Sequence, residues 1–188
     1  MEPSTTSNES YLDIVVRLYS DPDLSPGFLM LKPGFDQELV DMTLRKIHDS
    51  NLSVERWDDV MIPRLGAIAM LSGSVLLNAA EDYNFGNSWK KDTIEYLSSA
   101  KSRVFAISGH DTASRCLDIR KDIRRLTGKV ASSPDRVMSD DQFYLQVVQN
   151  TIHSPDTHEI APFAWIIDEL VDSPVAMDSR SMSRARSS

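Results

Sequence analysis

The sequence has almost no cysteine, no long apolar run and no excess of basic residues. Its single cysteine, Cys116, excludes an internal disulfide and is typical of a reducing compartment. No apolar run approaches the ~18 residues of a membrane span. The start, MEPSTTSNES, has neither the basic nor the apolar region of a signal peptide. We therefore expect a cytoplasmic protein that has no membrane partner.

Acidic residues outnumber basic ones by 28 to 20, and the net charge is -8. A nucleic-acid backbone would be repelled by the average field of such a chain, so we do not expect a general nucleic-acid partner. Any site for an anion must instead be a local concentration of positive charge.

The two ends differ in composition from the middle. Residues 1–10 are rich in serine, threonine and glutamate, and residues 173–188 alternate serine with arginine. Neither stretch contains enough apolar residues to anchor a core. We predict two disordered tails around one domain over residues 11–172. A phosphorylation site or a polyanion contact in the Ser/Arg tail is the alternative.

Strand-like and helix-like segments alternate between these tails. Short apolar or alternating runs predict strands, and apolar residues at helical spacing predict helices. The order is β-α-β-(α)-β-α-β-α, with the helices of two β-α-β halves on one side. This order favours an α+β fold, a ferredoxin-like sandwich in which helices cover a four-stranded antiparallel sheet. The strands are expected at 28–32, 52–62, 103–109 and 145–153, and the helices at 35–51, 63–80, 88–99, 112–128 and after Asp156.

The predicted helix 112–128 and its exit concentrate positive charge. Arg120 and Arg124 are four residues apart and so share a helical face, a geometry suited to gripping a phosphate chain. A solvated face with ion pairs to Asp118 and Asp122 is the alternative, and spacing alone does not decide between them. The cations are Arg115, Arg120, Lys121, Arg124, Arg125 and Lys129.

His153 ends the last apolar run, immediately before the turn into the last predicted helix. The first amides of a helix favour an anion, and an imidazole that is neutral near pH 7 is a competent nucleophile toward phosphorus. A histidine that only caps or packs at a strand end is the structural alternative. The four histidines and one cysteine have no spacing typical of a zinc site.

Two stretches resemble the two ends of a nucleoside diphosphate kinase. FLMLKPGF (28–35) is similar to the opening strand of that family, which ends in Lys-Pro-Asp. NTIHSPDTHE (150–159) resembles the family's Asn-x-x-His-Gly-Ser-Asp motif. The resemblance covers roughly residues 27–170, and the predicted element order agrees with the family's fold.

The resemblance implies a phosphotransferase that moves the γ-phosphate of a nucleoside triphosphate to a nucleoside diphosphate through phosphohistidine at His153. It also implies Mg²⁺ bound with the nucleotide and a closed homo-oligomer. The nucleotide-binding residues that it implies are Lys32 for the transferring phosphate, Asn150 for the sugar hydroxyls, Arg124 and, as the nearest candidate, Arg136 for other phosphates, Trp89 for stacking on the base, and Tyr83 for the active-site tyrosine.

The sequence also departs from the family pattern. Ser154-Pro155 replaces Gly-Ser after the histidine, Val130 replaces a threonine, and Ala164 stands where the family has a glutamate that orients the histidine. Loss of such a carboxylate lowers activity strongly in other triad-like sites. Glu159 is a candidate substitute. The alternative function is therefore a catalytically weak or inactive kinase-like protein that binds nucleotides or acts as a scaffold.

Overall fold

The computed structural model describes residues 9–72, 88–127 and 151–171. Tyr83, Arg136 and Asn150 lie outside these ranges, as do residues 1–8 and the expected tail 173–188. The side chain of Trp89 is also outside the description, although its backbone belongs to helix α5.

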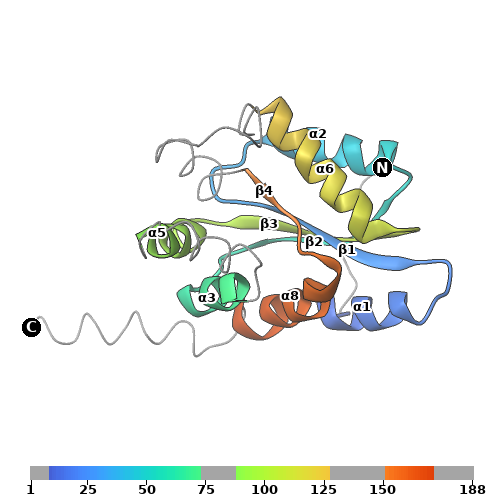
Figure 1. Ribbon diagram of the computed structural model, residues 1–188, viewed down its shortest axis with the longest axis horizontal. Helices are drawn as coiled ribbons and strands as arrows, with labels where there is room; N and C mark the ends of the chain where they lie inside the picture. Colours follow the sequence, from blue (N-terminus) through green and yellow to red (C-terminus); the bar gives the residue numbers. More distant parts are fainter. Residues whose placement is uncertain (1–8, 73–87, 128–150, 172–188) are drawn as a thin grey trace, which may run out of the picture.

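Four strands form one antiparallel sheet in the order β2-β3-β1-β4 (Figure 1). They are β1 (Ser25–Leu31), β2 (Ser53–Val60), β3 (Ser102–Gly109) and β4 (Ile152–His153). The predicted ferredoxin-like, four-stranded antiparallel sheet is confirmed. Of the last predicted strand, only residues 151–153 are among those described.

Helices cover both faces of the sheet. The two crossover helices, α2 (Gln37–Asp49) and α6 (Thr112–Leu126), lie together on one face, as predicted (Figure 1). Alternate residues of the central strands divide between the faces, because side chains alternate along a strand. Phe28 and Met30 join the core opposite α2 and α6, whereas Leu29 and Leu31 join the core beneath them. The opposite face is covered by α1 (Tyr11–Tyr19), α3 (Arg64–Ser72), α5 (Ser88–Leu97) and α8 (Ile160–Ile166).

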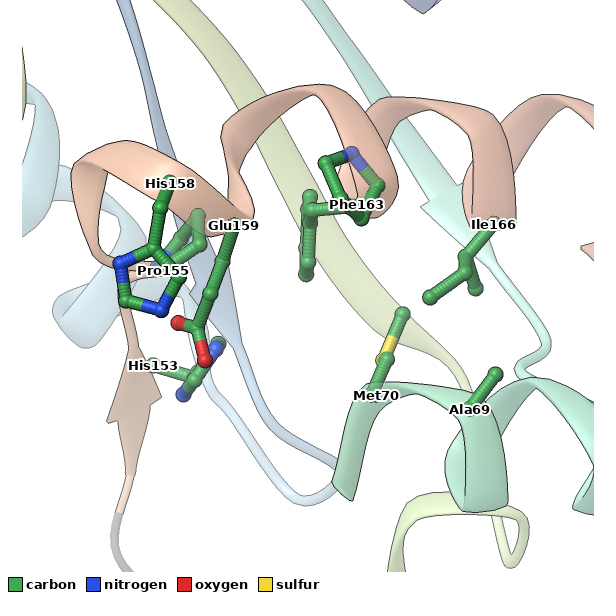
Figure 2. Close-up of a pocket in the computed structure, with 9 residues that line it drawn as sticks. Ala69, Met70, His153, Pro155, His158, Glu159, Phe163 and Ile166 are labelled. Atoms are coloured by element: carbon green, nitrogen blue, oxygen red, sulfur yellow. The ribbon is translucent and has the colours of Figure 1, made fainter. Parts of the chain in front are cut away.

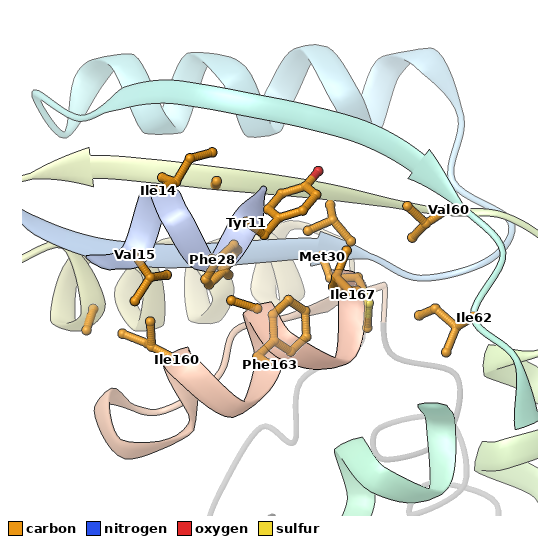
Figure 3. Close-up of a cluster of buried hydrophobic side chains, with 14 of the residues drawn as sticks. Tyr11, Ile14, Val15, Phe28, Met30, Val60, Ile62, Ile160, Phe163 and Ile167 are labelled. Atoms are coloured by element: carbon orange, nitrogen blue, oxygen red, sulfur yellow. The ribbon is translucent and has the colours of Figure 1, made fainter. Parts of the chain in front are cut away.

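Helix α1 has no counterpart among the predicted elements. Ser10 caps it, because the Ser10 hydroxyl accepts a hydrogen bond from the Asp13 amide at 3.0 Å. The Asp168 carboxylate accepts hydrogen bonds from the amides of Tyr11 and Leu12 at 2.9 and 2.8 Å. Helix α1 is thus joined to the C-terminal end of the described chain. Figure 3 shows its buried side chains beside those of β1 and α8.

Helix α6 lies unusually close to β1 at Gly27. A Cβ atom on Gly27 would lie 2.7 Å from Thr112 Cγ2 and 3.0 Å from Cys116 Sγ, so a larger residue there would push the helix away. Further along the helix, the C-terminal half of α6 lies beside β4, where Arg124 contacts Ile152. The fold therefore brings the arginines of α6 to the histidine that ends β4.

The chain turns from β4 into its last helix through a short 3₁₀ segment, Thr157–Glu159, and α8 continues into a π-helical segment, Ile167–Val171. Asp156 precedes the 3₁₀ segment, as the sequence predicts for the last helix, and its amide donates to Glu159 Oε2 at 2.9 Å, which is one half of a capping box. Among residues 9–72, 88–127 and 151–171, no helix has the length and apolar composition needed to cross a membrane.

Candidate active site

His153 lies at the edge of the sheet and not inside its core. Its backbone pairs with Met30 of β1, while the preceding residue, Ile152, is fully buried. His153 is half-buried, and its ring lies 6.0 Å from the Phe163 ring, tilted by 32°. The strand therefore places the imidazole at the edge of the sheet, next to one aromatic side chain.

A pocket of about 110 Å³ opens beside this ring, between α3 and the turn into α8 (Figure 2). Sites that enclose a drug-sized ligand typically measure about 300–1,000 Å³. The described residues thus form only one part of any site for a whole nucleotide. The lining residues are Ala69, Met70, His153, Pro155, His158, Glu159, Pro162, Phe163 and Ile166.

Two arginines of α6 hold the backbone on either side of His153. Arg124 donates through Nε and Nη2 to the carbonyl oxygen of Ile152, at 3.2 and 2.8 Å. Arg120 donates through Nη1 to the carbonyl oxygen of Ser154 at 3.0 Å. The predicted shared face of these arginines is present, and it points toward β4.

Two other cations of α6 fit the alternative interpretation of the charged helix, whereas Arg115 donates to the carbonyl oxygen of Ser50 at 2.6 Å. Lys121 pairs with Asp118 at 2.9 Å, and Arg125 pairs with Asp122 at 3.2 Å; all four side chains are exposed or half-buried. The helix thus has a solvated face of local ion pairs and a separate face whose arginines meet β4.

Lys32 lies beside the same histidine. It is buried, and its amide donates to the carbonyl oxygen of Thr151 at 3.0 Å, next to the start of β4. The turn that follows Lys32 is fixed by the Tyr96 hydroxyl, which donates to the carbonyl oxygen of Pro33 at 2.5 Å, and by Gly34, whose φ of 85° suits glycine. Sequence reasoning did not identify Tyr96.

Burial and these cations hold the pKa of His153 well below its ordinary value of 6.5. Burial is the larger cause, followed by the positive charges of Lys32, Arg120 and Arg124. The imidazole is consequently neutral at pH 7 and keeps a free lone pair for nucleophilic attack.

The positive charge around His153 is only partly balanced. Burial, and then the neighbouring charge of Arg120, lowers the pKa of Arg124 to about 10, so the guanidinium is still charged at pH 7. No carboxylate in the described part of the chain pairs with Arg124. Burial also lowers the pKa of Arg120, against the opposing effect of Asp156 and Glu159. The site therefore has positive charge available for an anion.

Ala164 stands at the family position of the orienting carboxylate, so that carboxylate is missing. The Ala164 side chain is fully buried in the core beneath α8. Glu159 lines the pocket instead, and Figure 2 shows its carboxylate directed toward His153. One of its oxygens, Oε2, accepts a hydrogen bond from the Asp156 amide at 2.9 Å. His158, which is not among the predicted site residues, lines the same pocket.

The fold thus brings together three of the predicted site residues, Lys32, Arg124 and His153. Their roles toward a nucleotide stay predictions, as do those of Tyr83, Trp89, Arg136 and Asn150, whose side chains lie outside the description. The same ranges contain no group of three or more histidine, cysteine, aspartate or glutamate side chains placed to hold a metal ion.

No protein-family model matches the sequence, and no curated protein is similar enough in sequence to count as a relative. Solved structures do match. A nucleoside diphosphate kinase from Pyrobaculum aerophilum is 17% identical with a TM-score of 0.51, over 79% of this chain and 100% of that one. The nucleoside diphosphate kinase from Aquifex aeolicus is 13% identical with a TM-score of 0.51, over 81% of this chain and 98% of that one.

The fold is nucleoside diphosphate kinase-like. At these identities the likeness shows the fold alone, and it covers most of this chain and nearly all of each matched chain. The kinase-like fold is a finding independent of the local geometry around His153, and the two together are the basis for a function.

Proposed function

We propose that the protein is a nucleoside diphosphate kinase-type phosphotransferase, which moves the γ-phosphate of a nucleoside triphosphate to a nucleoside diphosphate through phosphohistidine at His153. The observation that carries the proposal is a half-buried histidine that lines a pocket and is kept neutral by burial and by Lys32, Arg120 and Arg124. The kinase-like fold supports it.

In the first half-reaction, a lone pair of the neutral His153 ring attacks the γ-phosphorus. A nitrogen–phosphorus bond forms as the bond from phosphorus to the bridging oxygen breaks, and the diphosphate leaves with the electron pair. In the second, an oxygen of another diphosphate attacks the same phosphorus and the ring nitrogen recovers its lone pair. Phosphoryl transfer depends mainly on positioning and charge stabilisation, and the cations near the ring supply both.

The positive charge that forms on the ring during the attack is offset by Glu159, which lines the same pocket. Mg²⁺ carried on the nucleotide phosphates supplies further charge neutralisation when bound. We assign Tyr83, Trp89, Arg136 and Asn150 to the remaining walls of the nucleotide site. A homo-oligomer in the cytoplasm completes the proposal.

The test is covalent labelling. The protein is incubated with γ-labelled ATP and Mg²⁺, and we expect label that is lost in acid, kept in base and absent from His153→Gln. His158→Gln is the matched control, because it removes the other imidazole of the pocket, and it should label like wild type. An excess of unlabelled diphosphate should then remove the label as triphosphate. Equal labelling of His153→Gln and wild type would overturn the assignment.

A second function has its own support. Arg120 and Arg124 donate hydrogen bonds to backbone carbonyl groups, which leaves fewer donors for a phosphate, and Ala164 has no carboxylate to orient His153. The site therefore also fits a protein that binds nucleotides with little turnover. Nucleotide binding to wild type without any histidine-dependent label would favour this binding or scaffold protein.

A further inference from the structure

The carbonyl groups on both sides of His153 are held by side chains of a different element. Arg124 of α6 holds the carbonyl of Ile152, and Arg120, one helical turn earlier, holds that of Ser154. We call this pair of contacts the arginine bracket. It spans the peptide units that set the direction of the imidazole.

The backbone here has few other fixed points. Within the described residues, β4 consists of Ile152 and His153 only, and it pairs with β1 along one edge. Pro155 follows immediately and has no amide hydrogen to donate. The carbonyl of Ser154 therefore depends on the α6 side chain that reaches it.

Arg120 has a second property that a purely structural contact does not need. Its Nε is buried and has no hydrogen-bond partner among residues 9–72, 88–127 and 151–171. Buried donors are nearly always paired in folded proteins. The protein therefore keeps this guanidinium next to β4 although one of its donors is left unsatisfied.

We propose that Arg120 is the positioning residue of His153, and that the arginine bracket does the orienting work of the carboxylate that is absent at Ala164. The inference rests on the proposed phosphotransferase function. It assigns a role to a residue that the resemblance to nucleoside diphosphate kinases does not, because Arg120 is at none of the site positions which that resemblance implies.

Removing Arg120 should change His153 in two ways. The Ser154 carbonyl loses its donor, so the ring is held less firmly, and one of three cations near the ring disappears, so the pKa of His153 rises. The charged and titratable groups around the ring are Lys32 immediately after β1, Arg120 and Arg124 from α6, and His158 and Glu159 from the turn into α8.

The experiment uses the full chain and three substitutions at Arg120. Arg120→Met removes the donor and the charge, Arg120→Gln keeps a donor without charge, and Arg120→Lys keeps the charge with a shorter reach. Arg125→Met is the matched control, because it removes a cation from the exposed face of the same helix. Circular dichroism checks that each variant folds. If Arg120→Met does not fold, the test is made with Arg120→Gln and Arg120→Lys.

Two readouts separate positioning from general stability. Nitrogen NMR of the unphosphorylated protein gives the pKa and tautomer of His153, and steady-state transfer gives kcat and KM. For Arg120→Met we expect a higher His153 pKa and a kcat lower by about 10-fold or more at unchanged KM, the scale seen when outer-shell partners of a ligand histidine are removed. Arg120→Lys should restore the low pKa and part of kcat.

The inference is overturned if Arg120→Met, or in its place Arg120→Gln, leaves the pKa, tautomer and kcat as Arg125→Met leaves them. Failure of the proposed function is distinguishable from this result. Absence of a phosphohistidine would remove the kinetic readout, but the pKa and tautomer of the free protein would still show whether Arg120 positions the ring.

Discussion

Arg103 and Arg124 are both partly buried, but only the charge of Arg103 is paired with a carboxylate among the described residues. Arg103 of β3 donates through Nε and Nη2 to Asp59 at 2.6 and 2.9 Å, and its guanidinium lies 4.4 Å from the centre of the Trp57 ring. The hydrogen bond to Asp59 raises the pKa of Arg103. Arg124 has only the carbonyl of Ile152 as an acceptor among the described residues, and burial lowers its pKa.

This difference indicates that the charge of Arg103 stabilises the fold, whereas the charge of Arg124 can bind a ligand. A charge withdrawn from water is costly unless a partner of opposite sign compensates it. Asp59 supplies that partner for Arg103 inside the protein. For Arg124 the described residues supply none, so an anion from solution is the natural partner. The unbalanced arginine lies at the end of the sheet where the neutral histidine is presented.

The largest effect is expected from Arg124→Met. Loss of its charge and donors should slow phosphorylation of His153 by about 100- to 1,000-fold, the scale seen when one donor to a developing negative charge is removed. Single-turnover labelling measures the rate, with Arg125→Met as the control on the same helix. If Arg103→Met slowed labelling as much as Arg124→Met, the distinction between the two arginines would be wrong.

The next effect concerns stability. Arg103→Met removes the ion pair to the exposed Asp59 and the contact of the guanidinium with the Trp57 ring, and we expect the free energy of unfolding to fall by about 1 kcal/mol. The labelling rate of the folded protein should not change. Urea unfolding of Arg103→Met, Asp59→Asn and the double variant forms a cycle in which the two losses should not add. Additive losses would mean that the ion pair contributes little.

The Asp59–Arg103 pair and His153 should affect stability in different pH ranges. Arg103 holds the pKa of Asp59 below its ordinary value of 3.8, so this carboxylate stabilises the protein above about pH 4, and that contribution is lost as pH falls further. His153 has a folded pKa below 6.5, so the unfolded chain binds the extra proton and stability falls as pH drops below 6.5.

His153→Gln should therefore lose less stability than wild type between pH 7 and pH 5, whereas Asp59→Asn should differ from wild type in pH dependence only near and below pH 4. Urea unfolding at several pH values measures both changes. His158→Gln is the control at the pocket. An identical loss between pH 7 and pH 5 for wild type and His153→Gln would contradict the low pKa of His153.

The smallest effect is expected on the solvated face of α6. Lys121→Met and Arg125→Met each break an exposed ion pair three residues apart, and such pairs contribute at most about 0.5 kcal/mol. Neither substitution should change the labelling rate. A large change in either quantity would mean that this face also takes part in the site.

Periodicity predicted the sheet and the crossover helices, because these depend on local patterns that a single segment contains. Helix α1 was missed, although Ser10 and Asp13 form a capping box and Ile14 and Leu18 have helical spacing, because the segment was assigned to the start of a domain without an element of its own.

The site was predicted only in part for a different reason. A strand that ends in His153 can be recognised from one segment, and so can the shared face of Arg120 and Arg124. The carbonyl groups that these arginines meet belong to another element 28 and 34 residues away, and only the packing of α6 on β1 brings them together. The spacing of charges on one helix contains no information about that packing.

The most direct test of the account is an NMR pH titration of His153 in the wild-type protein, with and without the magnesium complex of a nucleoside diphosphate. We predict a pKa well below 6.5 in the free protein, because three cations and burial oppose protonation. That pKa should rise when the bound anion offsets those cations. A histidine that titrates at its ordinary pKa, unchanged by the nucleotide, would contradict the claim that unbalanced positive charge surrounds a neutral nucleophile.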